Sequence, residues 1–152
     1  MPAKDKIKIH PRRKARIGVL CALYAAAQVS EDSGKILKDV YRREKFTNSN
    51  KDFIRSLFME TLSQADACDK LIDEYLENWE FNRIALLDKL ILRMAITEMV
   101  FIEEVPPKVA ISEAIEIAKE YSTAESSSFV NGILDTVYKQ SKSKQHKKAK
   151  AS

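Results

Sequence analysis

The sequence predicts an all-α protein. Only 3 of its 152 residues are glycine and 4 are proline, so few residues interrupt helices. Apolar residues recur mostly at the three- and four-residue spacing of a helix face, and no strand-like alternation of useful length is present in the sequence. A chain of this length can bury a real core and suits one domain.

The first half of the sequence predicts helices separated by short polar joints. Residues 11–29 form the first helix, with Pro11 at its start, where a missing N–H costs nothing. A second helix opens at Gly34, and a third begins near Asn50 and either ends or bends near residues 63–66. The expected buried face of the first helix consists of Ile17, Leu20, Cys21, Tyr24 and Ala27.

The second half of the sequence contains the most apolar helix, residues 84–102. Its apolar side chains surround much of the circumference, so it is expected to be a central helix packed on several sides. Pro106 and Pro107 end it, and Ser112 is the expected N-cap of the next helix. After a Ser-rich joint, a last helix is expected over residues 128–138.

Asn131-Gly132 in this last segment leaves two interpretations open. The pair fits a type I′ hairpin turn, which needs positive φ at both central residues. The flanking segments are short and do not alternate, so the favoured interpretation is a helix in which Gly132 marks a close approach to another helix.

Charge is concentrated at the two ends of the chain. Residues 1–16 carry a net charge of +6 and residues 139–152 another +6, although the whole chain carries only +4. The body between them is therefore acidic, and the basic ends suggest contact with a polyanion, or two solvated tails. The sequence thus divides into a basic N-terminal arm (1–10), a helical domain (11–138) and a Lys-rich tail expected to be disordered (139–152).

The N-terminal basic cluster is the better binding candidate, because it runs into a helix that fixes its charges in space. Guanidinium and ammonium groups in such a cluster can bridge phosphates and stack on unpaired bases. The cluster consists of Arg12, Arg13, Lys14 and Arg16.

No constellation in the sequence indicates catalysis, a cofactor or a metal site. Both histidines lie in terminal polar segments, and Glu-x-x-His, Cys-x-x-Cys and Gly-rich phosphate motifs are absent from the sequence. Cys21 and Cys68 are expected to be buried, reduced thiols. No apolar run reaches the roughly 20 residues of a membrane span, and the start lacks a signal-peptide core, so a cytoplasmic protein without membrane contact is expected.

Three blocks of the sequence resemble the transcription antitermination factor NusB family. They are RRKAR followed by a helix ending Ala22-Leu23-Tyr24, LLDKLILRMAITEM (86–99), and VPPKVAISEAIEIAKEYS with SFVNGILD (within 105–135). The resemblance covers residues 11–138. It implies about seven helices in two small bundles that pack on each other as one compact domain.

The resemblance also implies a function. Family members bind the boxA element of ribosomal RNA leader transcripts together with NusE, a small ribosomal subunit protein, and help assemble an antitermination complex on RNA polymerase. The residues implied to bind RNA are Arg12, Arg13, Lys14, Arg16, Glu125 and Phe129. Those implied to bind NusE are Tyr24 and Asp88.

Two of these residues have alternative interpretations. Phe129 is either a core side chain, which the sequence favours, or a partly exposed platform on which a base stacks. Asp88 lies in an apolar run, so it sits on an open edge facing NusE or forms an internal salt bridge, for example to Arg93.

The sequence departs from the family at Ser126, Ser127 and Ser128, which precede Phe129, because family members often carry basic residues at these positions. The Lys-rich tail is a candidate source of that positive charge.

The alternative functions are a helical adaptor that binds only protein and a domain like those fused to ribosomal-RNA methyltransferases. The lack of a Rossmann-like Gly-rich segment argues against an enzyme. The sequence leaves open whether the protein is a monomer or a homodimer.

Overall fold

The computed structural model describes residues 10–76 and 81–151. These ranges contain seven α-helices, one short 3-10 helix and no strand, which confirms the all-α prediction and the expected number of helices. The chain forms two compact units, residues 1–59 and 60–152, and the division falls within α3 (Asn48–Ser63).

The first unit contains α1 (Pro11–Gln28), α2 (Ser33–Arg43) and most of α3, and α1 packs on α2. The start of α1 follows from its sequence. Pro11 occupies the first helical position, and the Nδ1 atom of His10 accepts a hydrogen bond from the backbone N–H of Arg12 at 3.2 Å.

The buried face of α1 differs from the predicted one. Leu20 is buried as expected, but Cys21, Tyr24 and Ala27 are exposed and Ile17 is only partly covered. The face that is buried consists of Ala15, Arg16, Gly18, Val19, Leu20, Ala22 and Leu23. The buried face is rotated from the predicted one towards Ala15, Gly18 and Ala22, small residues that the apolar spacing did not single out.

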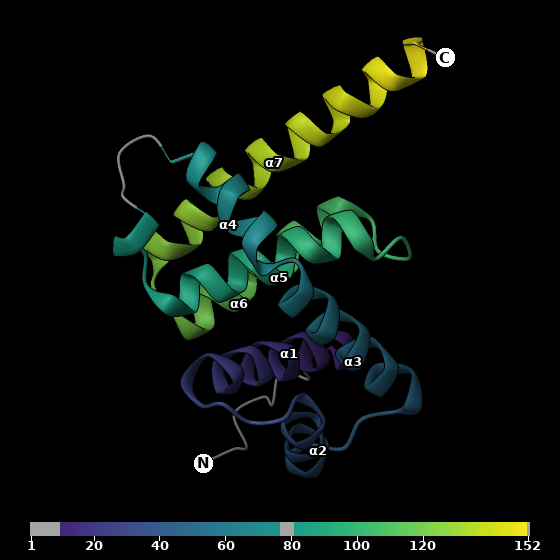
Figure 1. Cartoon of the computed structure of the whole chain (residues 1–152), viewed down its shortest axis with the longest axis vertical. Helices are drawn as coiled ribbons and strands as arrows, with labels where there is room; N and C mark the ends of the chain where they lie inside the picture. Colours follow the sequence, from purple (N-terminus) through teal and green to yellow (C-terminus); the bar gives the residue numbers. More distant parts are fainter. Residues whose placement is uncertain (1–9, 77–80, 152) are drawn as a thin grey trace, which may run out of the picture. The chain divides into compact units, whose positions relative to one another are not determined.

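The second unit contains α4 (Ala65–Glu74), a 3-10 turn (Phe81–Arg83), α5 (Leu86–Phe101), α6 (Pro107–Tyr121) and α7 (Ala124–Ala151). Helices α5, α6 and α7 pack on one another, and α4 packs on α5 (Figure 1). Nine of the 16 residues of α5 are buried, which confirms it as the central helix.

A bidentate ion pair links helix α4 to helix α5. The Nε and Nη2 atoms of Arg93 donate to the two carboxylate oxygens of Asp69, each at 2.7 Å. Both side chains are about one-fifth exposed, so this forked geometry is held with little competition from water.

Three helix boundaries are informative. The break expected near residues 63–66 is confirmed, because α3 ends at Ser63 and α4 begins at Ala65. The N-cap prediction for Ser112 is wrong, because the N-cap of α6 is Pro106, six residues earlier. The second proline, Pro107, occupies the first helical position, where proline favours the start of a helix.

The last helix is longer than predicted at both ends. Residues 124–127 belong to α7 rather than to a joint, and α7 continues through residues 139–151, where the sequence suggested disorder (Figure 1). The segment after Gly132 contains no further glycine or proline, and its Lys, Gln and Ala residues have high helix propensity, so nothing in it ends the helix.

Of the two interpretations of Gly132, the helix is confirmed, whereas the hairpin turn and the close approach to another helix are both wrong. It lies within α7 and no described glycine has positive φ, which excludes the hairpin turn. A Cβ added at Gly132 would meet nothing within 4 Å, so no helix approaches closely there. The close approach is at Gly18, where a Cβ would lie 3.3 Å from Val40 Cγ1 and 3.4 Å from Phe46 Cζ.

We predict opposite effects of leucine at these two glycines. Gly18→Leu should lower the free energy of unfolding by about 1–3 kcal/mol, because the side chain must displace its neighbours. Gly132→Leu should raise it by about 0.5–1 kcal/mol, because a helix interior gains a residue of better propensity in open space. Urea melts of the two variants test this, and a loss of stability at position 132 would contradict the assignment of Gly132 to an open helix face.

We also predict that the two thiols react differently, in contrast to the expectation that both are buried. Cys21 is exposed. Cys68 is buried with its Sγ 3.6 Å from Thr97 Oγ1. Burial raises the pKa of both thiols, so access to the reagent distinguishes them. An alkylating reagent should therefore modify the folded protein once, at Cys21, as read by mass spectrometry of peptides. Denatured protein, in which both thiols react, is the control.

Candidate functional site

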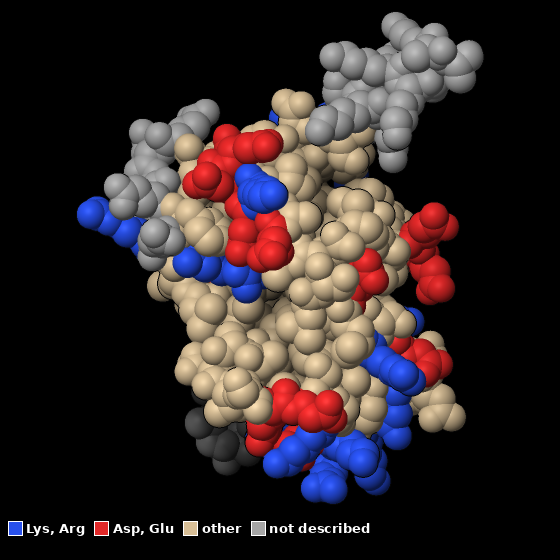
Figure 2. Space-filling model, viewed as in Figure 1, with Lys and Arg blue, Asp and Glu red and all other residues tan. Residues whose placement is uncertain are grey.

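The first turn of α1 and the last turn of α2 together form a basic surface in the first unit, consisting of Arg12, Arg13, Lys14, Arg42 and Arg43. The two turns are brought together by Lys14, whose Nζ lies 3.5 Å from Oε1 of Glu44, the residue that follows α2. Figure 2 shows Lys and Arg side chains gathered over the α2 region at the foot of the view, beside several acids. Arg42 and Arg43 are not among the residues predicted to bind RNA, although their place in the last turn of a helix is visible in the sequence.

Two of the predicted RNA-binding arginines lie over one aromatic ring. The guanidinium carbon of Arg12 is 4.3 Å from the centroid of Phe53, and that of Arg16 is 5.4 Å from it. Arg12 is partly exposed, whereas Arg16 is only 3% exposed. Arg16 could therefore reach a phosphate only by leaving its buried position, so Arg12, Arg13 and Lys14 are the better placed of the four.

Tyr24 lies three turns further along α1. It is 48% exposed, so a large aromatic side chain is open to solvent on the first unit. An exposed tyrosine can supply a rigid contact with an apolar body and a polar tip, which suits a protein interface.

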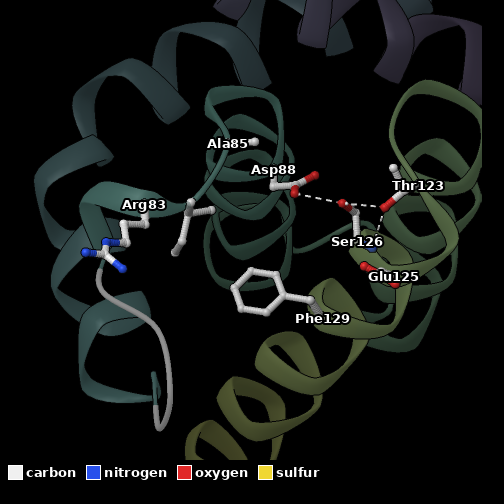
Figure 3. Close-up of a pocket in the computed structure, with 8 residues that line it drawn as sticks. Arg83, Ala85, Asp88, Thr123, Glu125, Ser126 and Phe129 are labelled. Atoms are coloured by element: carbon white, nitrogen blue, oxygen red, sulfur yellow. Dashed lines mark hydrogen bonds between the residues drawn. The ribbon is translucent and has the colours of Figure 1, made fainter.

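The second unit has a pocket of about 250 Å³ where the start of α7 meets the start of α5 (Figure 3). It is lined by Arg83, Ile84, Ala85, Asp88, Thr123, Glu125, Ser126 and Phe129. The pocket therefore brings together Glu125 and Phe129, predicted to bind RNA, with Asp88, predicted to bind NusE. Phe129 is partly exposed and its ring borders the pocket, which is the structural requirement for stacking and differs from the favoured core assignment.

Asp88 occupies an unusual environment. It is only 7% exposed, so it does not sit on an open edge, and Arg93 binds Asp69 instead of Asp88. Its Oδ2 accepts a hydrogen bond from the Ser126 hydroxyl at 2.9 Å, while its buried Oδ1 has no hydrogen-bond partner among the described residues. A buried carboxylate oxygen without a donor is costly. Because the atom is buried, a donor from outside the chain could reach it only through the pocket that Asp88 lines.

Ser126 is the centre of a small hydroxyl network at the start of α7. Its Oγ accepts from Ser122 Oγ at 2.9 Å and from Thr123 Oγ1 at 3.1 Å, and it donates to Asp88. Thr123 Oγ1 also accepts from the backbone N–H of Ser126 at 3.0 Å, which caps the helix. The sequence showed this segment only as a Ser-rich joint, and Ser126 was missed as a site residue.

Other kinds of site find no support in the described part of the chain. It holds no group of three His, Cys, Asp or Glu residues placed to bind a metal ion. None of its helices combines the length and the apolar character needed to cross a membrane.

These features define a class: a small all-α protein of two helical units, with a basic surface on one unit and an aromatic, acidic pocket on the other. The family model that matches the sequence is the NusB family, over residues 10–139. The chain belongs to the NusB family.

Curated relatives agree with this assignment. The chain is 46% identical over 127 residues to the transcription antitermination protein NusB of Salinibacter ruber, covering 83% of this chain and 79% of that protein. It is 40% identical to the protein of the same name from Thermodesulfovibrio yellowstonii, covering 85% and 92%.

Solved structures share the fold. T. maritima NusB matches with a TM-score of 0.77 at 37% identity, covering 86% of this chain and 92% of that one. NusB in a structure of the antitermination factors NusB and NusE in complex with dsRNA also matches with a TM-score of 0.77, at 22% identity, covering 86% and 97%. At that identity the second match is evidence for the fold alone.

Proposed function

We propose that this protein is an RNA-binding transcription antitermination factor of the cytoplasm. With NusE it binds the boxA RNA of ribosomal RNA leader transcripts and helps assemble an antitermination complex on RNA polymerase, acting by binding rather than by catalysis. The observation that carries the proposal is the first turn of α1, where a helix holds Arg12, Arg13 and Lys14 beside the basic end of α2. The names of the relatives, and the NusB–NusE–RNA complex formed by a protein of the same fold, support it.

The basic surface supplies the sequence-independent part of RNA binding. Each lysine or arginine that neutralises a phosphate releases counterions, so this contribution weakens as salt rises. Arg12 is partly ordered in advance by its position over Phe53, which reduces the rotamer entropy it loses on binding.

The pocket of the second unit supplies a place for an unpaired base. The ring of Phe129 offers a stacking face, and the carboxylate of Glu125 can accept hydrogen bonds from the amino group of a base. The single-stranded character of a boxA element fits this chemistry, because a paired base could not enter such a pocket.

NusE is proposed to use Asp88 and Tyr24. The buried Oδ1 atom of Asp88 has no donor among the residues that the structure describes, and a basic side chain of the partner that enters the pocket would satisfy it. Tyr24 offers an exposed aromatic contact on α1.

We predict that the double variant Arg13→Ala, Lys14→Ala binds boxA RNA about 1–3 kcal/mol more weakly than wild type, because two phosphate contacts are lost. The slope of log K against log salt should become shallower by about 1.4, the value for two contacts to a single strand. Filter binding or fluorescence titration over a salt series measures both quantities.

The matched control for this variant is Lys35→Ala, Lys38→Ala, which removes two exposed lysines nearer the other end of α2. Lys35 forms a surface ion pair with Glu31, just as Lys14 does with Glu44, so each variant loses at least that pair. Equal losses of affinity in the two double variants would show that net charge alone matters. Wild-type protein that fails to bind boxA RNA, yet binds NusE, would favour the protein-only adaptor.

We predict that Asp88→Asn weakens NusE binding at least about tenfold, since the charge that attracts a basic partner residue is removed. Asparagine keeps the size of the side chain and retains an oxygen that can accept from Ser126, so RNA binding without NusE should change little. Calorimetric titrations with NusE and with RNA separately give the two affinities. Unchanged NusE affinity would remove Asp88 from that interface.

A further inference from the structure

Ser126 lies between the residues assigned to the two ligands. It follows Glu125 directly and precedes Phe129 by three positions, so it shares the first turns of α7 with the residues proposed to hold RNA. Its hydroxyl donates to Asp88 Oδ2, on the residue proposed to bind NusE (Figure 3). One hydrogen bond of 2.9 Å therefore joins the proposed NusE residue on α5 to the helix start that carries the proposed RNA residues.

We propose that Ser126 is a positioning residue that couples NusE binding at Asp88 to RNA binding at Glu125 and Phe129. The proposal rests on the function proposed above and assigns to Ser126 a role distinct from contact with either ligand. Its hydroxyl transmits the orientation of the Asp88 carboxylate to the first turn of α7.

The physical basis is the half-satisfied carboxylate. The terminal torsion of an aspartate is broad, so a carboxylate held at one oxygen retains rotational freedom. A donor from NusE that enters the pocket lined by Asp88 and reaches the buried Oδ1 fixes the second oxygen, and the whole group then presents Oδ2 to Ser126 in one orientation. The hydrogen bond from Ser126 is to a charged acceptor in a buried place, where it is stronger than a hydrogen bond between neutral groups.

Ser126 can pass this constraint to the pocket because it is bonded within its own helix start as well. Its backbone N–H and its hydroxyl both bond to Thr123 Oγ1, and Ser122 also donates to its hydroxyl. An ordered Asp88 therefore reduces the motion of a capped helix turn rather than of one side chain. By linkage, RNA that orders this turn must raise the affinity for NusE by the same factor as NusE raises the affinity for RNA.

The test uses Ser126→Ala in the full chain, with Ser128→Ala as the matched control. Ser128 is an exposed serine two positions further along α7. The dissociation constant for boxA RNA is measured with and without saturating NusE, and the ratio of the two values is the coupling factor. In wild type and Ser128→Ala this factor should lie in the roughly 5- to 150-fold range of typical couplings, and in Ser126→Ala it should fall to within about twofold of one.

Two readouts separate positioning from a structural role. Any loss of affinity of Ser126→Ala for NusE alone should be smaller than that of Asp88→Asn, and Ser126→Thr, which keeps a hydroxyl, should restore most of the coupling factor. A Ser126→Ala protein that loses affinity for each ligand separately while its coupling factor stays at the wild-type value would overturn the proposal.

Hydrogen exchange of the free protein provides a test without any ligand. Amides in the first turns of α7 should exchange faster in Asp88→Ala and faster still in Ser126→Ala, which also loses the bonds from Ser122 and Thr123. The double variant should be no faster than Ser126→Ala, because that variant already lacks the bond to Asp88. Additive effects would overturn the proposal. If wild type binds both ligands but Ser126→Ala keeps the full coupling factor, the proposed role of Ser126 is wrong and the proposed function of the protein stands. If wild type binds neither ligand, both the role of Ser126 and the proposed function are wrong.

Discussion

The second unit is organised by the need to cover α5. A helix that is apolar around most of its circumference must bury several faces at once, and α4, α6 and α7 supply the cover. The start of α7 is thereby brought to the start of α5. The pocket with Asp88, Ser126 and Phe129 forms at that junction, where the two helix ends supply both polar and apolar side chains. Its position is therefore a consequence of core packing.

Much of this organisation could be predicted from the sequence, because it depends on patterns that are local in the chain. The apolar run that became α5, the break between Ser63 and Ala65, and the helical state of Gly132 all follow from composition and spacing. The order of three sequence blocks added the family and, with it, three residues of the pocket, Asp88, Glu125 and Phe129.

The remaining features depend on tertiary placement. The buried face of α1 is set by Gly18, which lies against Val40 and Phe46 and carries no hydrophobic signal in the sequence. The burial of Arg16 and the single hydrogen bond of Asp88 could not be read from spacing, since each depends on which helix lies opposite. Ser126 was hidden in a run of three serines, whose hydroxyls differ only in what they face.

The exposure of Cys21 has a practical consequence. The thiol lies seven residues beyond Lys14, about 10 Å along the helix axis, and three residues before Tyr24. A fluorophore attached there would sit between the proposed RNA-binding and NusE-binding positions of α1, without any engineered cysteine. The natural sequence thus offers a reporter position from which the order of arrival of the two ligands could be followed in real time.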